Sequence, residues 1–333
     1  MIVTLTEGAD PGAVRDALTG LGLWVVPLRG RRGPGQFLVR PFSGDVERAR
    51  VLALPGVEDV LAPASRHPLV DGAPATVRVG GVRLGEGETP VLMAGPCAVE
   101  SERSIHDAAT RVAAAGGRFL RGGAFKPRSS PHDFQGLGTE ALRWLREAAD
   151  AQGLGVVTEA VSEASVEAVA AVADLVQIGS RNMHNSTLLA AAGRAGRPVL
   201  VKRGMAATVE EWLLAGEYCL AAGAPAVVFC ERGIRSFDDR TRNLLDLASV
   251  ALLRHVHRVP VIVDPSHALG RRDLVPPLAR AAIAAGAAGL LVEVHPDPAH
   301  ARSDGPQALS FDELALLARA LAAPESAAAP LPG

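Results

Sequence analysis

Short apolar stretches alternate with alanine-rich, helix-compatible segments from Pro90 onward. We interpret eight of these stretches as strands, at Val91–Ala94, Phe119–Arg121, Gly155–Thr158, Leu175–Ile178, Val199–Lys202, Ala226–Cys230, Val261–Val263 and Gly289–Glu293. They recur roughly every 20–40 residues, the spacing of strand–helix units. Eight such units predict a (β/α)8 or TIM barrel over residues 90–321. A doubly wound sheet is the alternative, but no Gly-x-Gly-x-x-Gly turn follows the first strand.

A smaller α/β pattern precedes the barrel, over residues 1–65. We expect strands at residues 2–5, 23–28, 36–40 and 57–61, and helices at residues 11–18 and 45–52. The resulting order βαββαβ predicts a ferredoxin-like domain. Because this segment contributes none of the ligand-type residues considered below, we expect its role to be regulatory.

Two further segments complete the predicted organisation. Residues 66–89 form a connector rich in glycine and proline, in which Thr76–Val79 and Val82–Leu84 have the pattern of a small hairpin. Residues 322–333 consist mainly of alanine, proline and serine, so we expect a disordered tail.

Composition excludes several classes of protein. Hydrophobic residues make up 48% of the 333 residues, which is enough for a substantial core, and the net charge of −2 gives no general case for nucleic acid or an acidic membrane surface. We find no signal peptide and no apolar segment of the ~18 residues that a membrane span needs. Cys97, Cys219 and Cys230 lack the spacing of a disulfide framework, so we expect a cytoplasmic location.

The loop after the second predicted strand carries the densest chemistry. It reads Arg121-Gly-Gly-Ala-Phe-Lys-Pro-Arg-Ser-Ser-Pro131 and suits phosphate or carboxylate recognition, with a solvated basic turn as the alternative. Only two of the 34 Lys and Arg residues are lysines, Lys126 and Lys202. Arginine stays protonated, whereas lysine can donate a proton. We therefore interpret both lysines as required for the chemistry and not as present by chance.

Side chains at the carboxyl ends of barrel strands converge on one face, where barrel active sites lie. The first predicted strand is followed by Cys97, the seventh by His267, and the eighth ends in Glu293, with Asp304 in the loop beyond. Strands one, seven and eight are neighbours once a barrel closes. A thiolate, an imidazole and two carboxylates therefore predict a divalent-metal site, although each residue alone has a structural explanation.

Six cations follow the apolar strands at the same end of the predicted barrel. They are Arg121, Lys126, Arg128, Arg181, Lys202 and Arg232. Such a group repels itself unless anions bind, so we expect two or more anionic groups of substrate. A metal beside a polyanion site indicates carbonyl polarisation during carbon–carbon bond chemistry.

The chain resembles the 3-deoxy-D-arabino-heptulosonate-7-phosphate synthases, in the class with an N-terminal ferredoxin-like domain. The matching stretches are Ala94-Gly-Pro-Cys97, Arg121 to Pro131, Gln177-Ile-Gly-Ser-Arg-Asn-Met183, Val201-Lys-Arg-Gly204, Phe229-Cys-Glu-Arg-Gly-Ile-Arg235, Asp264-Pro-Ser-His267 and Ser303-Asp304. The resemblance implies a transferase that condenses phosphoenolpyruvate with erythrose 4-phosphate, the first step of the shikimate pathway to chorismate and the aromatic amino acids.

The resemblance also implies residue roles. Cys97, His267, Glu293 and Asp304 would bind the metal, with Mn²⁺ the leading candidate. Phosphoenolpyruvate would contact Ser180, Arg181, Lys202 and Arg232 through its phosphate, and Arg121 and Lys126 through its carboxylate. Arg128 and Ser129 would bind the aldose phosphate, with Ser129 standing where threonine is common. The implied catalytic residues are Lys126, Glu159, His267 and Asp264.

The resemblance makes three of these roles more specific. Lys126 would protonate the aldehyde oxygen, with a pKa lowered by Arg121 and Arg128 unless neighbouring anions cancel that effect. Glu159 would position a water near C2 of the enol, and Asp264 would contact the aldose hydroxyls or the metal-bound water. His184 stands where glutamine is usual, and we assign it no role.

Several alternatives stay open at this stage. A 3-deoxy-D-manno-octulosonate-8-phosphate synthase acting on arabinose 5-phosphate is the nearest, although Lys126-Pro-Arg-Ser-Ser130 favours the four-carbon aldose. A lysine Schiff-base aldolase and a non-catalytic anion-binding barrel are the others. The resemblance further implies a homo-oligomer, specifically a tetramer, and feedback inhibition by an aromatic amino acid.

Overall fold

The protein folds into two compact units in a computed structural model, Met1–Arg66 and His67–Gly333. The structure describes residues 1–28, 35–40, 43–44, 46–62, 65–126, 130 and 132–322.

The first unit contains a four-stranded antiparallel sheet in the order β2-β3-β1-β4. Its elements are β1 Ile2–Leu5, α1 Pro11–Gly20, β2 Val25–Leu28, β3 Gln36–Val39, α2 Arg48–Leu52 and β4 Val57–Leu61. Asp10 caps α1 by accepting the Gly12 N–H at 2.8 Å, and Pro11 occupies the first turn, where its missing N–H costs nothing. Leu18 of α1 and Val3 of β1 share one buried core. The predicted element order is confirmed.

Helix α2 is shorter than predicted. It begins at Arg48, because Glu47 is extended with ψ of 135° and makes no side-chain capping bond. Asp45, where we expected the helix to begin, lies outside the described residues.

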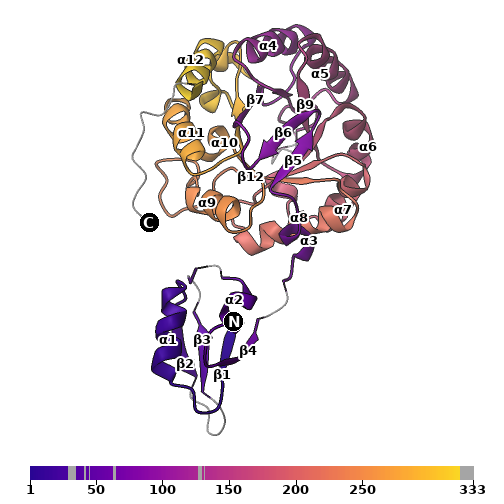
Figure 1. Ribbon diagram of the computed structural model, residues 1–333. Coiled ribbons are helices and arrows are strands. Elements are labelled where there is room, and N and C mark those ends of the chain that lie inside the picture. Colours follow the sequence, from indigo (N-terminus) through magenta and orange to yellow (C-terminus); the bar gives the residue numbers. More distant parts are fainter. Residues whose placement is uncertain are drawn as a thin grey trace. The chain divides into compact units, whose positions relative to one another are not determined.

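The second unit is a closed barrel of eight parallel strands, as predicted (Figure 1). Its strands are β7 Val91–Gly95, β8 Phe119–Arg121, β9 Gly155–Ala160, β10 Leu175–Ile178, β11 Val199–Lys202, β12 Val227–Glu231, β13 Val261–Val263 and β14 Gly289–Glu293. Strand β14 closes the barrel by pairing with β7, from Gly289 opposite Val91 to Glu293 opposite Gly95. Both faces of most strands are buried, which explains their continuous apolar runs.

Helices surround the barrel and cover its outer face (Figure 1). They are α4 Glu102–Ala114, α5 Thr139–Ala151, α6 Glu163–Val172, α7 Ser186–Arg194, α8 Val209–Ala221, α9 Leu247–His255, α10 Pro265–Leu269, α11 Val275–Ala284 and α12 Phe311–Ala322. Capping side chains start several of them. In α8, Thr208 and Glu211 form a reciprocal capping box. Of the tail predicted at 322–333, Ala322 is instead the last residue of α12, and residues 323–333 lie outside the described residues.

The segment predicted as a connector is packed against the barrel. A short helix that we did not predict, α3 Pro68–Asp71, presents the N–H groups of Leu69 and Val70 to the Glu217 carboxylate at 3.0 and 2.9 Å. The predicted hairpin is present as β5 Thr76–Val79 and β6 Val82–Gly85.

The hairpin closes the amino-terminal end of the barrel. Val77, Val79 and Leu84 pack with the interior side chains of the barrel, including Met93 and Phe119. The carboxyl ends of the strands, where the candidate site lies, are at the opposite end. In the part of the chain that the structure describes, no helix is long and apolar enough to cross a membrane.

Candidate active site

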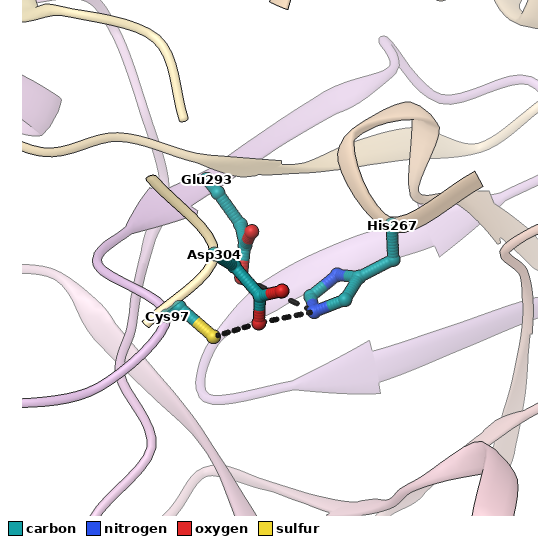
Figure 2. Close-up of side chains that lie close together, drawn as sticks. All are labelled: Cys97, His267, Glu293 and Asp304. Carbon is teal, nitrogen blue, oxygen red and sulfur yellow. Dashed lines mark hydrogen bonds and ion pairs between the residues drawn. The ribbon is translucent and has the colours of Figure 1, made fainter. Parts of the chain in front are cut away.

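Four ligand-type side chains meet at one point at the carboxyl end of the barrel, as predicted (Figure 2). Cys97 follows β7, His267 lies in α10 directly after β13, Glu293 ends β14, and Asp304 lies in the loop beyond. Their ligand atoms all lie within 4.8 Å of one another. Cys97 Sγ is 3.0 Å from Asp304 Oδ2, and His267 Nε2 is 3.2 Å from Glu293 Oε1.

Local hydrogen bonds orient this cluster. Asp264 caps the short helix α10 by accepting the backbone N–H of His267 at 2.9 Å. Its other oxygen lies 2.7 Å from His267 Nδ1, which leaves Nε2 facing the carboxylates. Ser266 Oγ accepts the backbone N–H of Glu293 at 3.0 Å. The imidazole orientation is thus set by a neighbouring carboxylate, as is usual for histidines that bind metals.

The electrostatics of the cluster fit a divalent cation. Burial raises the pKa of the Cys97 thiol to about 12, with the charge of Glu293 adding to the effect. Burial likewise holds the pKa of His267 below its ordinary value, so its imidazole is neutral at pH 7. The pKa values of Glu293 and Asp304 are lowered, despite burial, chiefly by His267, whose imidazole is protonated in the acidic range where these carboxylates titrate. Two carboxylates, a neutral imidazole and a thiol form a ligand set of mixed hardness that suits a transition-metal ion.

A polar cavity of about 100 Å³ lies beside this cluster. The five described cations of the predicted set all line it, together with Glu159 and Ser180. They are Arg121, Lys126, Arg181, Lys202 and Arg232. Arg128 and Ser129 lie outside the described residues. The predicted convergence of cations is therefore observed for every member that the structure describes.

Three of the cations are buried and held in different ways. Arg121 donates to Glu293 Oε1 at 3.0 Å and to the Pro96 carbonyl at 2.9 Å. Lys202 pairs closely with Asp264. Arg232 Nη1 has no hydrogen-bond partner among the described residues, although it is fully buried. A buried guanidinium N–H without a partner costs free energy, and an anion in the cavity would satisfy it.

Lys126 lies between the two parts of the site. Its Nζ donates to Cys97 Sγ and to the Cys97 carbonyl, both at 3.0 Å. We expected a lowered pKa, and this expectation is wrong. Burial alone would lower the pKa of Lys126, but the acidic groups around it, Cys97 first and then Glu159, outweigh burial and raise the pKa. Lys126 is therefore protonated at neutral pH.

The Asp264 carboxylate lies between a cation of the cavity and the ligand cluster. It is fully buried and is not among the residues that line the cavity. One of its carboxylate oxygens receives both Lys202 Nζ and His267 Nδ1. The carboxylate thus links the cationic wall of the cavity to the imidazole of the ligand cluster.

The structure adds residues that the sequence reasoning did not assign. Gln177 donates to Glu159 Oε2 at 3.1 Å, and both line the cavity. Arg242 lies 3.3 Å from Asp304 Oδ1 and 3.1 Å from Gln307 Oε1, and it also lines the cavity. Gln177 lies within a stretch that carried the resemblance, so a signal existed for it. Arg242 follows no apolar strand, and only the folded loop reveals its place.

The fold and site together define a class. It is a (β/α)8 enzyme with a cavity lined by cations, beside a set of candidate metal ligands at the carboxyl ends of its strands. The model of the DAHP synthetase I family matches residues 66–328, and the chain belongs to that family.

Relatives of known name agree with this membership. The chain is 50% identical over 236 residues to a phospho-2-dehydro-3-deoxyheptonate aldolase of Thermotoga maritima, covering 71% of this chain and 70% of the relative. It is 35% identical over 264 residues to a 2-dehydro-3-deoxyphosphooctonate aldolase of Acidithiobacillus ferrooxidans, covering 74% and 92%. The crystal structure of the Thermotoga maritima phospho-2-dehydro-3-deoxyheptonate aldolase (DAHP synthase) matches with a TM-score of 0.75 at 41% identity, covering 96% of this chain and 95% of that chain.

Proposed function

We propose that this chain condenses phosphoenolpyruvate with erythrose 4-phosphate to give 3-deoxy-D-arabino-heptulosonate 7-phosphate and phosphate. The observation that carries the proposal is the convergence of five cations on one cavity beside a set of candidate metal ligands. A substrate pair with two phosphates and a carboxylate supplies anions for these cations.

The described part of the cavity offers cations for both anionic groups of phosphoenolpyruvate. Its phosphate would bind Arg181, Lys202 and Arg232, with the backbone of Ser180 contributing, and the unpartnered Nη1 of Arg232 supports this assignment. Its carboxylate would bind Arg121 and Lys126. The aldose phosphate would bind Arg128 and Ser129, which belong to the same loop as Lys126 in the sequence.

A divalent metal, for which Mn²⁺ is the leading candidate, would be held by Cys97, His267, Glu293 and Asp304. When bound, the ion supplies Lewis-acid polarisation of the aldehyde carbonyl. Asp264 holds the His267 ring so that Nε2 stays directed toward the other ligands. Because Asp264 also pairs with Lys202, it supports both a cation that would bind the phosphate and a metal ligand.

Lys126 would supply the proton for the aldehyde oxygen when C3 of phosphoenolpyruvate attacks the aldehyde carbon. Its raised pKa keeps it protonated at neutral pH, which suits an acid, and its Nζ lies beside the ligand cluster. Attack by C3 leaves cationic character at C2, where water adds before phosphate leaves by C–O cleavage. Glu159, oriented by Gln177, would position that water.

Three competing functions are less well supported. A Schiff-base aldolase needs a lysine that readily becomes neutral, and the raised pKa of Lys126 opposes this. A 3-deoxy-D-manno-octulosonate-8-phosphate synthase would use the same enol donor, but the relatives with that printed specificity are less similar to this chain than the Thermotoga maritima aldolase. A non-catalytic barrel has no reason to retain all four ligand-type residues.

The first unit is proposed to be a ferredoxin-like regulatory domain over residues 1–65, followed by a connector and hairpin at 66–89 and a catalytic barrel at 90–321. None of its described residues belongs to the site. An aromatic amino acid binding to it, in a homotetramer, would regulate the first step of a pathway that makes such amino acids. The buried free thiols of Cys97, Cys219 and Cys230 suit a reducing cytoplasm.

The proposal is tested by adding erythrose 4-phosphate to the protein and phosphoenolpyruvate and following loss of the enol chromophore. Turnover should cease after treatment with a chelator and return with Mn²⁺ or another divalent ion. Full turnover by chelated, metal-free protein would refute the metal assignment. Trapping of a borohydride-reduced lysine adduct, unaffected by chelator, would instead support the Schiff-base mechanism.

A further inference from the structure

A buried ionic network lies directly behind the cationic wall of the cavity, and no step proposed above uses it. Its centre is Arg203, the residue after Lys202, which is 4% exposed. Its Nη1 donates to Glu231 Oε2 at 3.0 Å, to Asp246 Oδ2 at 2.8 Å and to Ser249 Oγ at 3.1 Å. Its Nε donates to the Ala207 carbonyl at 3.2 Å.

Each side chain at the centre of this network adjoins a cation of the cavity wall. Arg203 follows Lys202 at the end of β11, and Glu231 precedes Arg232 at the end of β12. Lys202 and Arg232 line the cavity. Arg203 and Glu231 instead bond to each other and to Asp246, the residue that caps α9. The alternation of side chains along a strand therefore places cavity ligands on one face and the ion network on the other.

The network fixes the backbone on both sides of Arg232. Glu231 Oε1 accepts the Gly233 N–H at 2.6 Å while Oε2 accepts from Arg203, so one carboxylate holds both the turn and the neighbouring strand. Gly233 has a φ of +91°, and a Cβ there would lie 2.7 Å from that of Asn243. The turn that aims Arg232 at the cavity is thus tightly constrained.

We propose that Arg203 is a positioning residue that sets the separation of Lys202 and Arg232 and so tunes the site for a phosphate group. The inference rests on the proposed function, in which these two cations bind the phosphate of phosphoenolpyruvate. A guanidinium is suited to this task because its fixed fork serves several acceptors at once, whereas an ammonium is a compact point charge. Displacing bound groups by about 1 Å can cost two orders of magnitude in rate.

The test compares Arg203→Lys with Arg146→Lys as a matched control. Arg146 also bonds a carboxylate and backbone carbonyls, those of Asp174, Val172 and Leu154, but near the amino-terminal ends of β9 and β10. We expect Arg203→Lys to raise the KM for phosphoenolpyruvate at least about tenfold and to leave the KM for erythrose 4-phosphate within about twofold. The control should lower Tm without changing either KM.

Glu231→Gln provides a second variant if Arg203→Lys does not fold. A carboxamide cannot accept hydrogen bonds from both Gly233 and Arg203 through its two terminal atoms, because one of them is a donor. This variant should also raise the KM for phosphoenolpyruvate selectively.

Direct binding separates this inference from the proposed function. Calorimetric titration of each protein with phosphoenolpyruvate and with inorganic phosphate requires no turnover. If the wild type binds phosphate but shows no condensation, the proposed function fails, and weaker phosphate binding by Arg203→Lys still supports the positioning role. Wild-type phosphate affinity and KM in a folded Arg203→Lys or Glu231→Gln variant would overturn it, leaving Arg203 a purely structural residue.

Discussion

Metal binding to the four-residue cluster should release one proton, and that proton should come from Cys97. At neutral pH the thiol, with a pKa of about 12, is the one protonated ligand of the four, since His267 is already neutral and both carboxylates are ionised. Cysteine binds a metal ion as the thiolate, so the thiol proton must leave. The pKa lies about five units above pH 7, so deprotonation costs about 7 kcal/mol of the intrinsic binding free energy at that pH.

The pH dependence of the metal affinity is set by the number of protons bound in the metal-free and metal-bound states. From neutral pH up to the pKa of the thiol, the metal-free site holds one more proton than the metal-bound site, so the apparent affinity for metal rises with pH. The expected change is about tenfold per pH unit, or about 100-fold between about pH 6.5 and pH 8.5. Competition titration of Mn²⁺ against a chelating dye measures it, and calorimetry in buffers of different ionisation enthalpy counts the proton.

The matched control is Cys97→Asp, which keeps an anionic ligand but removes the thiol proton. Its metal affinity should change little with pH above about pH 7, because a carboxylate is already ionised there. A flat profile for the unmodified protein would refute the reasoning. Equal metal affinity in Cys97→Ala would remove Cys97 from the ligand set altogether.

Three further predictions concern Lys126 as the proton donor, Glu159 as the residue that positions water, and the first unit. Lys126→Arg keeps the charge but not a usable proton donor, so steady-state kinetics should show kcat reduced about 10²-fold; a near-normal kcat with a raised KM would mean that Lys126 only binds anion. Gly179→Ala would place a Cβ 2.0 Å from Glu159 Oε1 and displace that carboxylate, so kcat should fall about tenfold or more, and an unchanged kcat would exclude Glu159 from the water step. Deleting residues 1–65 should leave activity but abolish inhibition by tyrosine, phenylalanine or tryptophan; equal inhibition of both forms, or none of the intact protein, counts against a regulatory role.

The barrel and most of its site could be predicted from the sequence because strand ends are local features with a fixed consequence. An apolar run such as Val261–Val263 ends where polar residues begin, and parallel closure brings those ends together. Cys97 and Asp304 are far apart in sequence, yet their contact follows from the pairing of β14 with β7. The convergence of the four ligand-type residues could therefore be predicted from the strand ends together with closure of the barrel.

Features that depend on contacts between side chains from different strands could not be predicted. The pKa of Lys126 is raised because the acidic groups of Cys97 and Glu159 outweigh burial. No local sequence pattern reveals this balance. Asp264 follows a strand like a cavity residue, but the turn into α10 directs its carboxylate toward Lys202 and His267. The hairpin was predicted by its local turn, whereas its role in closing the barrel is set by long-range packing.

The most direct measurement of the central claim is substrate choice. The protein, supplied with Mn²⁺ and phosphoenolpyruvate, is given erythrose 4-phosphate or arabinose 5-phosphate, and phosphate release and the sugar product are followed by NMR. The account predicts stoichiometric phosphate release with erythrose 4-phosphate, a seven-carbon 3-deoxy sugar phosphate as product, and a kcat/KM at least about 100-fold lower with arabinose 5-phosphate, the scale that differential binding of one substrate can supply. Preferential use of arabinose 5-phosphate, or no consumption of phosphoenolpyruvate with either aldose, would contradict it.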